Sequence, residues 1–178
     1  MSLLVKNSIL FCYFVLFLLH KSTNAFALSA SNTPKIIKNF NKWSSITALN
    51  EENDKICYSI SNPIRSLTNY KYPRKPYLML SIFNKLNYEI SIISDFNNRK
   101  NSIIFFEVDN KSFRFIVKNN NIGYSIYNND MEIIKYLLGA KIINIVTETD
   151  DGKYAVDTYS LDGFKGSYNQ TIECAKIK

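Results

Sequence analysis

The strongest constraint on the fold is a succession of short apolar segments separated by clusters of Asn, Asp, Lys and Gly. After the first 42 residues these segments are rich in Ile, Phe, Tyr and Val, the residue types that strands favour. In the segment SFRFIVK, Phe113, Phe115 and Val117 point one way and Arg114 and Lys118 the other, a period of two that marks a strand with one buried face. The same criteria predict strands over residues 43–48, 56–61, 77–83, 87–94, 102–108, 112–118, 122–127, 141–148 and 153–160.

Turn residues connect several of these segments into hairpins. Asp109-Asn110 and the stretch from Asp150 to Gly152 each fall between two predicted strands and tolerate the backbone angles of tight turns. Residues 129–139 and 164–175 instead place apolar side chains at helical spacing, so each predicts a short helix. Together these elements predict an all-β fold, an antiparallel β-sandwich or jelly-roll-like body with one or two short helices, formed by a single domain over residues 43–178.

The first 25 residues have the features of a secretory signal peptide. Lys6 supplies positive charge, an apolar run of 12 residues ends at Leu19, and Ala25 provides a small residue for cleavage. A helix needs about 20 apolar residues to cross a bilayer, so this run is short for a membrane anchor, although an uncleaved anchor is the alternative. We predict that residues 1–25 are removed, that residues 26–42 form a flexible leader, and that no transmembrane helix follows.

Removal of the signal peptide leaves a chain without histidine, because the sequence holds a single histidine, His20. Ser-His-Asp and Cys-His catalysis and histidine-rich zinc sites are therefore excluded. The 5 glycines form neither a GxxxxGK[ST] nor a GxGxxG pattern, so no phosphate-binding loop is expected. We expect no cofactor, no metal site and no catalytic residues.

The formal charge of +7 comes from 22 Lys and Arg residues against 15 Asp and Glu residues. Only 4 of the basic residues are arginines, and the lysines of the mature chain are scattered from Lys35 to Lys178. Nucleic-acid interfaces gather basic residues in one stripe and use arginine for bidentate contacts. The basic charge therefore does not indicate a nucleic-acid partner.

Cys57 and Cys174 are the two cysteines that remain after export. An even pair of cysteines in an oxidising compartment favours a disulfide. This one would close a loop of more than one hundred residues, for which chain-entropy models give about 4–5 kcal/mol of stabilisation. Two free buried thiols are the alternative.

Acidic residues gather at Glu148, Asp150 and Asp151. They could be calcium ligands or paired carboxylates for hydrolysis, but Asp-Asp-Gly is also the composition of a solvated hairpin turn, which we favour. Asp157 differs, because it lies within a predicted strand, where a carboxylate is costly unless it is exposed or paired. We expect it to stabilise a turn or to pair with an arginine.

The segment from Tyr70 to Tyr77 interleaves aromatic and basic residues. Such residues bind anionic glycans, phospholipid surfaces or protein partners through stacking and charge. The alternative is a proline-stiffened loop that leads into the next strand. The candidate partner surface consists of Tyr70, Lys71, Tyr72, Arg74 and Lys75.

The carboxyl-terminal part of the chain resembles a known family. Residues 157–164, DTYSLDGF, with Cys174 ten residues later, resemble the closing signature of the invasion-associated locus B family. Trp43, the CYSIS segment at 57–61 and the RKPYL segment at 74–78 are similar to the opening pattern of that family. The residues of this likeness for which we expect structural roles are Trp43, Arg74, Pro76, Asp157, Thr158, Tyr159, Ser160, Leu161, Gly163 and Phe164.

This resemblance extends over residues 43–174 and implies an exported alphaproteobacterial protein with a β-rich domain and no established enzymatic activity or cofactor. Many family members have another cysteine shortly after the tryptophan, where Ser45 and Ile46 stand here. The stretch before the closing signature, residues 147–154, is acidic and poor in arginine, whereas the family is usually rich in glycine and arginine there. Gly163 permits a sharp turn between the last strand and the final helix.

We therefore predict an exported, non-enzymatic interaction protein of the cell envelope, linked to virulence by the family that it resembles. Its partner would be an envelope or host protein or glycan, and its location the periplasm or the outside of the cell. Two alternatives stay open: a hydrolase that uses Asp and Glu side chains in a sandwich cleft, and a purely structural envelope protein. The hydrolase needs two acidic side chains in a cleft, one with a raised pKa, whereas an interaction protein needs an exposed apolar patch of roughly several hundred Å² or more.

Overall fold

The computed structural model describes residues 33–83, 87–119, 121–126, 129–149 and 151–176. The described residues form one compact unit, and Met1–Ser31 lie outside them. The predicted signal peptide and the first part of the predicted leader therefore lie outside the described part of the chain.

Eleven strands and two helices make up the described residues. The strands are β1 (Lys35–Phe40), β2 (Trp43–Leu49), β3 (Lys55–Ser61), β4 (Arg65–Thr68), β5 (Tyr77–Phe83), β6 (Asn87–Ile93), β7 (Ile103–Val108), β8 (Lys111–Asn119), β9 (Ile122–Ser125), β10 (Ile142–Glu148) and β11 (Tyr154–Ser160). The helices are α2 (Asp130–Gly139) and α3 (Phe164–Lys176). All nine strands and both helices expected from the sequence are present, with ends that differ by two residues at most.

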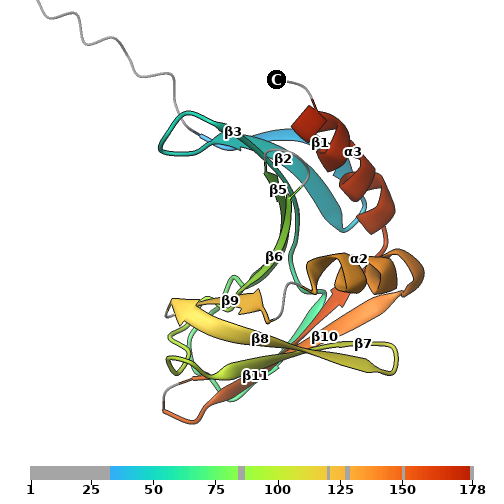
Figure 1. Ribbon diagram of the computed structural model, residues 1–178. Helices are drawn as coiled ribbons and strands as arrows, with labels where there is room; N and C mark the ends of the chain where they lie inside the picture. The colour runs from blue at the N-terminus through green and yellow to red at the C-terminus, as the bar shows by residue number, and fades with distance from the viewer. Residues whose placement is uncertain (1–32, 84–86, 120, 127–128, 150, 177–178) are drawn as a thin grey trace, which may run out of the picture. The chain divides into compact units, whose positions relative to one another are not determined.

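All strands pair antiparallel in one continuous sheet, in the order β1-β2-β3-β5-β6-β9-β8-β7-β10-β11-β4. Figure 1 shows one half of this sheet formed by β1, β2, β3, β5 and β6 and another by β8, β7, β10 and β11, with the short strand β9 between them. The predicted all-β, sandwich-like fold with two short helices is confirmed.

One face of the sheet carries the core. Along β7, Ile104, Phe106 and Val108 are buried, whereas the side chains between them point outward, as the two-residue period of a strand requires. Buried side chains from both halves of the sheet join a single cluster with Ile133 of α2 and Phe164 of α3. Because both helices contribute to this cluster, they cover the core side of the sheet (Figure 1).

The two edge strands of the sheet, β1 and β4, were not expected from the sequence. β1 pairs with β2, so the prediction that residues 26–42 form a flexible leader is wrong for Lys35–Phe40. β4 pairs with β11 over Arg65–Thr68. Every residue of β4 and nearly every residue of β1 is exposed, so neither strand shows the alternation that reveals a half-buried strand.

Aromatic residues hold the carboxyl-terminal helix against the first hairpin. The rings of Trp43 and Phe164 pack edge to face with centroids 4.8 Å apart, and the indole N–H of Trp43 donates to the carbonyl oxygen of Ser160 at 2.8 Å. Phe164 also stacks on Tyr168, with ring centroids 5.9 Å apart. The end of β11, the start of α3 and the start of β2 therefore share one buried contact.

Gly163 allows the turn between β11 and α3 to pack closely on the turn between β1 and β2. Its φ is +94°, and a Cβ at this position would lie 1.8 Å from the carbonyl oxygen of Phe40. Residues with a side chain rarely adopt such positive φ angles. Across the same contact, the side-chain amide of Asn41 donates to Asp162 at 2.9 Å and the Lys42 N–H donates to the Asp162 carbonyl oxygen at 3.2 Å.

A disulfide joins β3 to α3. It links Cys57 to Cys174, whose Cα atoms are 6.0 Å apart and which are separated by 117 positions in the sequence. The predicted pairing of these two cysteines is confirmed. It ties the first third of the domain to its last helix.

A layer of buried hydroxyl groups lies between α3 and the sheet. Thr171 Oγ1 is 3.0 Å from Ser45 Oγ and 2.9 Å from Ser59 Oγ, and the Ser167 hydroxyl donates to Ser59 Oγ at 2.9 Å. These small side chains let the helix approach β2 and β3 closely while each buried hydroxyl keeps a hydrogen-bond partner. We call α3, together with its aromatic, disulfide and hydroxyl contacts, the α3 closure.

Candidate functional site

A buried ion pair fixes the segment that connects β4 to β5. Arg74 and Asp157 bond through two pairs of atoms, Nη2 to Oδ2 at 2.8 Å and Nη1 to Oδ1 at 3.2 Å. Their side chains are only 3% and 2% exposed. Bidentate pairs of this kind combine strength with a defined geometry. Asp157 thus pairs with an arginine, which was one of the two roles expected for it.

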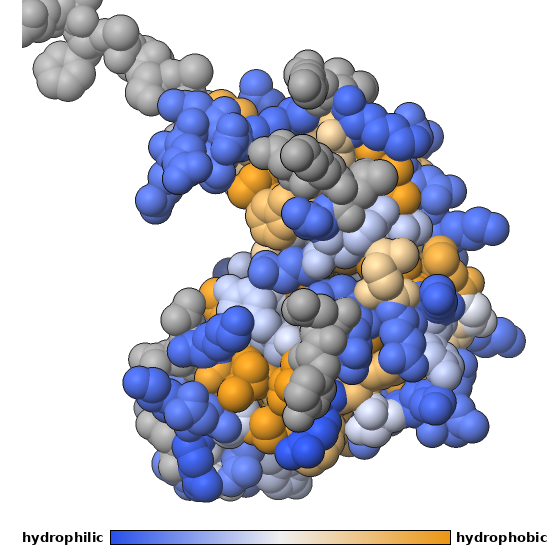
Figure 2. Space-filling view, in the orientation of Figure 1, coloured by the Kyte–Doolittle hydropathy of each residue, from blue (hydrophilic) through white to orange (hydrophobic). Residues whose placement is uncertain are grey.

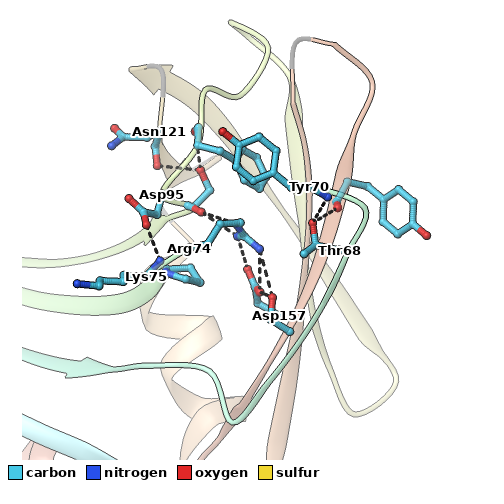
Figure 3. Close-up of polar contacts among 12 residues, drawn as sticks. Thr68, Tyr70, Arg74, Lys75, Asp95, Asn121 and Asp157 are labelled. Atoms are coloured by element: carbon cyan, nitrogen blue, oxygen red, sulfur yellow. Dashed lines mark hydrogen bonds and ion pairs between the residues drawn. The ribbon is translucent and has the colours of Figure 1, made fainter. Parts of the chain in front are cut away.

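The remaining hydrogen-bonding groups of the pair are also used. Arg74 Nε and Nη2 donate to the carbonyl oxygen of Ser94 at 3.1 and 2.8 Å, and the Ser66 hydroxyl donates to Asp157 Oδ1 at 2.5 Å. The guanidinium lies 4.4 Å from the centroid of the Phe96 ring. Figure 3 shows Arg74 at the centre of these bonds. The network links the segment before β5 to β11, β4 and the residues that follow β6.

The prediction that Arg74 belongs to an exposed partner surface is wrong, because this network buries its side chain. Tyr70 is half-buried, with its ring centroid 5.6 Å from that of Phe96 and 5.7 Å from that of Tyr72. Tyr72 itself is 71% exposed. The exposed members of the predicted surface are Lys71, Tyr72 and Lys75.

Backbone hydrogen bonds fix both ends of this segment. The N–H of Tyr70 donates to Thr68 Oγ1 at 2.9 Å, and the N–H of Lys75 donates to the Asp95 carboxylate at 2.5 Å (Figure 3). With Arg74 buried between these two points, the segment presents two lysines and a tyrosine from a backbone that is tied down on both sides. A segment fixed in this way does not carry the free-energy cost of ordering a loop on binding.

A row of apolar side chains crosses the outer face of β7, β10, β11 and β4. Phe105 stands opposite Val146, Val146 opposite Val156, and Val156 opposite Leu67. Leu67 and Phe105 are 50% and 44% exposed, and the two valines are half-buried. Tyr154, two residues from Val156 on the same face, is 50% exposed. We call these five residues the open face.

The open face was not identified from the sequence. Phe105 lies in a run of four apolar residues, Ile103 to Phe106, and such a run is the signal of a strand that is apolar on both faces. That signal was available, but it does not say which face the core covers. Leu67 gave no signal, because β4 itself was not expected.

Tyr154 of the open face is hydrogen-bonded to the two residues that precede the 70–77 segment. The Tyr154 N–H donates to Asn69 Oδ1 at 2.9 Å, and its carbonyl oxygen accepts from the Thr68 hydroxyl at 2.7 Å. The ammonium group of Lys153 lies 5.8 Å from the Tyr70 ring centroid. The Asp157 side chain that Arg74 binds points to the opposite face of β11 from Val156, so the 70–77 segment is anchored on the face opposite to the open face.

Other apolar groups also reach the surface. Figure 2 shows hydrophobic side chains over β8 and β9 and beside α2, within a largely hydrophilic face. On α2, Met131 and Leu138 are 45% and 41% exposed. A shallow hollow of about 330 Å³ on this helix is lined by Glu132, Lys135 and Tyr136. This hollow contains one carboxylate and one ammonium group, whereas the hydrolase alternative needs two carboxyl groups.

Glu89 and Asp130 are the described acidic pair that most resembles what a hydrolase would need. Burial raises the pKa of Glu89, and the Asp130 carboxylate raises it further, whereas Lys118 lowers it. Asp130, however, accepts hydrogen bonds from the Ile90 N–H and the Ser125 hydroxyl, both at 2.9 Å. These bonds give Asp130 a structural role at the start of α2.

The acidic residues between β10 and β11 belong to a turn. Hydrogen bonds from Lys153 and Thr149 lower the pKa of Asp151 to about 2. Gly152 follows with a φ of +78°, and the Thr149 N–H bonds to the Lys153 carbonyl oxygen at 2.7 Å. This is the hairpin turn that the sequence indicated. Asp150 lies outside the described residues.

Glu148, the third acid of that cluster, forms an exposed ion pair with Arg99 at 3.6 Å. The part of the chain that the structure describes holds no group of three or more His, Cys, Asp or Glu side chains placed to bind a metal ion. Among the same residues, no helix has the length and apolar character required to cross a membrane.

Residues of the closing signature make several separate contacts. Besides the pairing of Asp157 and the packing of Phe164, the Thr158 hydroxyl donates to Asn144 Oδ1 at 2.8 Å. Tyr159 is fully buried, and burial raises the pKa of its phenol. Pro76, from the opening pattern, is buried, and its carbonyl oxygen accepts from the Asn62 side chain at 3.2 Å. These contacts are all within the domain.

Comparison with known proteins identifies a relative at the level of the fold. No family model and no curated protein matches the chain. The crystal structure of invasion associated protein B from Bartonella henselae is similar, with a TM-score of 0.58 and 13% sequence identity. The match covers 78% of this chain and 97% of that chain. The two proteins share a fold, and at this identity the likeness extends no further.

Proposed function

We propose that this chain is an exported, non-enzymatic protein of the cell envelope that acts by binding a partner, and that it is a distant member of the invasion-associated locus B family. The shared fold with invasion associated protein B supports this placement, as do the sequence signatures at residues 43, 57–61, 74–78 and 157–164. Its partner is an envelope or host protein or glycan.

The observation that carries the binding role is the open face. Exposed apolar side chains in a contiguous row mark interaction surfaces, because soluble domains seldom leave such rows uncovered. Here Phe105 and Leu67 lie at the two ends of a row that crosses four strands. Aromatic and apolar anchors within a polar rim are typical of a protein-binding surface.

Export is the second part of the proposal. Residues 1–25 have the composition of a signal peptide, and the Cys57–Cys174 disulfide suits the oxidising compartments outside the cytosol. Removal of the signal peptide would place the mature protein in the periplasm or outside the cell. Amino-terminal sequencing of the protein recovered from envelopes should begin near Phe26 or Leu28. A start at residue 1 or 2 would contradict export by cleavage.

The binding role is tested by site-specific photo-crosslinking in intact envelopes. A photoreactive amino acid placed at Phe105 or at Tyr154 should yield the same crosslinked adduct, because both positions belong to the open face and are exposed. Glu173 on α3, whose side chain is 64% exposed, is the matched control and should yield none. Equal labelling at all three positions, or no adduct at Phe105 and Tyr154, would overturn the proposal.

A further inference from the structure

β4 ends the sheet, and it is a regular strand. Its four residues pair with β11 without a register shift, and all four are exposed. The opposite edge strand, β1, differs because its register shifts between Ile36 and Lys38. Register shifts and lysines protect an edge strand against further pairing. β1 has both, with lysines at Lys35 and Lys38, whereas β4 has neither.

The hydrogen bonds of Tyr154 show which backbone groups of β4 point outward. Both the N–H and the carbonyl oxygen of Tyr154 bond to the side of β4, through Asn69 and Thr68. In an antiparallel pair this direction alternates along the strand, so Val156 and Thr158 also face β4. Thr158 accordingly accepts from the Ile64 N–H at 2.8 Å.

The same alternation fixes β4 itself. Leu67 stands opposite Val156 and Arg65 opposite Thr158, so the backbone groups of Leu67 and Arg65 point toward β11. The N–H and carbonyl groups of Ser66 and Thr68 therefore point away from the sheet. A further strand would pair with these outward groups, and its side chains opposite Leu67 and Arg65 would lie in the closely spaced, non-hydrogen-bonded positions.

The side chains of β4 on the open face define what such a strand should carry. Leu67, 50% exposed, ends the apolar row, and an apolar residue opposite it would lengthen that row. The Arg65 side chain is exposed, and among the described residues it has no hydrogen-bond or ion-pair partner. An acidic residue opposite Arg65 would supply the complementary charge.

We propose that the outer edge of β4 binds an extended, acidic segment of the partner as an additional antiparallel strand. The segment carries an apolar residue opposite Leu67 and, two positions later in its own sequence, an Asp or Glu opposite Arg65. This inference deepens the proposed binding role and rests on it. Main-chain hydrogen bonds to Ser66 and Thr68 provide part of the affinity, and the two side-chain contacts provide the specificity.

The test uses a fluorescent, terminally blocked peptide with the core Thr-Ile-Thr-Glu-Thr and the purified mature domain. Binding is measured by fluorescence anisotropy. N-methylation of the threonine between Ile and Glu removes the N–H that would bond to Ser66, and should weaken binding by about tenfold or more. N-methylation of Ile removes an N–H that points away from β4, and should leave affinity nearly unchanged. Equal effects at the two positions would contradict strand addition.

Charge reversal tests the side-chain contact. Arg65→Glu should weaken binding of the Glu peptide and strengthen binding of a peptide with Lys at the same position. Leu67→Asp should abolish binding of both peptides. Ile36→Asp, on the other edge strand and 62% exposed in the wild type, is the matched control and should bind as the wild type does. Loss of binding in Ile36→Asp but not in Leu67→Asp would move the site to β1 and overturn the proposal.

Two further outcomes separate this inference from the proposed function. If photo-crosslinks form at Phe105 and Tyr154 while the peptides do not bind, strand addition is wrong and the binding role of the open face stands. Light scattering tests a second occupant of the edge. If the domain is a dimer and Leu67→Asp makes it a monomer, a second copy of this chain pairs with β4, and the proposal of an acidic partner segment is wrong.

Discussion

The α3 closure and the open face lie on one sheet, but the first is covered by a helix and the second is exposed. At the first, α3 covers β2 and β3, and its contacts include a disulfide, a buried hydroxyl layer and the packing of Trp43 on Phe164. At the second, the strands β7, β10, β11 and β4 bury one face in the core and leave Phe105 and Leu67 exposed on the other.

Because of this difference in burial, we expect stability to depend mainly on the α3 closure and binding on the open face. The side chains that make the aromatic, disulfide and hydroxyl contacts of the α3 closure are buried, so a change at one of them removes contacts that the fold requires. The open face contributes few buried contacts of its own, and its strands are already stabilised by their core side and by the Arg74–Asp157 pair beneath the 70–77 segment. Substitutions in the two regions should therefore have opposite effects on unfolding and on partner binding.

The largest effect is expected from Gly163→Ala. The new Cβ would meet the Phe40 carbonyl oxygen at 1.8 Å in a backbone conformation with φ of +94°. We expect a loss of about 5 kcal/mol or more in the free energy of unfolding, measured by chemical denaturation with the disulfide intact. Gly152→Ala is the control, because its φ of +78° is also positive but no atom lies within 4 Å of the added Cβ. Its cost should be only about 1–2 kcal/mol. Similar losses for both variants would show that the close contact with Phe40 does not matter.

Removal of the disulfide should have the next largest effect. Replacement of both Cys57 and Cys174 by Ala frees a loop of more than one hundred residues in the unfolded chain. The expected loss is about 4–5 kcal/mol in urea denaturation. Because the effect lies in the unfolded state, hydrogen exchange should become faster for every amide that exchanges only through global unfolding, including those of β10 and β11. Faster exchange confined to α3 would show instead that the disulfide acts by holding this helix in the folded state.

Breaking the buried ion pair should also be costly. Arg74→Met leaves the Asp157 carboxylate buried without its partner, and should destabilise the domain by about 3–5 kcal/mol. The double variant Arg74→Met with Asp157→Leu should recover much of that loss, which a double-mutant cycle would measure. Lys71→Met, an exposed neighbour, should change stability by less than about 0.5 kcal/mol. A small effect of Arg74→Met would show that this pair does not anchor the segment.

Alkaline pH should weaken the α3 closure through Tyr168. Burial, together with a hydrogen bond involving Tyr88, raises the pKa of Tyr168 to about 12. A phenol that holds its proton more tightly in the folded state contributes stability that is complete below its unfolded pKa of about 10 and is lost as pH rises through 12. Stability followed against pH should therefore fall in this window. The fall should be smaller in Tyr168→Phe, and an unchanged profile in that variant would contradict this assignment.

The smallest effect on folding, with a complete effect on binding, is expected at Phe105. Phe105→Ala should change the free energy of unfolding by no more than about 1 kcal/mol, because the side chain is 44% exposed. The adjacent Phe106→Ala, fully buried in the wild type, should cost about 3–5 kcal/mol. Partner crosslinking from Tyr154 should be lost in Phe105→Ala. If crosslinking persists, the apolar row is not part of the binding surface.

Much of the fold follows from local sequence. The strand over 77–83 was predicted to the residue, and the helices at 130–139 and 164–176 within one residue, because alternation and helical spacing record which side chains are buried. The pairing of Cys57 with Cys174 also followed, since no other cysteine lies after the predicted signal peptide. The candidate site was only half predicted, because the 70–77 segment was recognised but the burial of Arg74 was not.

By itself, therefore, the sequence determined the strands and helices that bury one face, and these determined the antiparallel fold. It also contains the predicted signal peptide. Tertiary structure alone decided where the sheet ends, because β1 and β4 are strands through pairing with β2 and β11 rather than through burial of their own side chains. It also decided that Arg74 faces Asp157, 83 positions away, and that Phe105 faces solvent while Phe106 faces the core. Burial within a segment leaves a local pattern, but the choice of neighbour across the sheet depends on residues far apart in the chain, and no single segment records it.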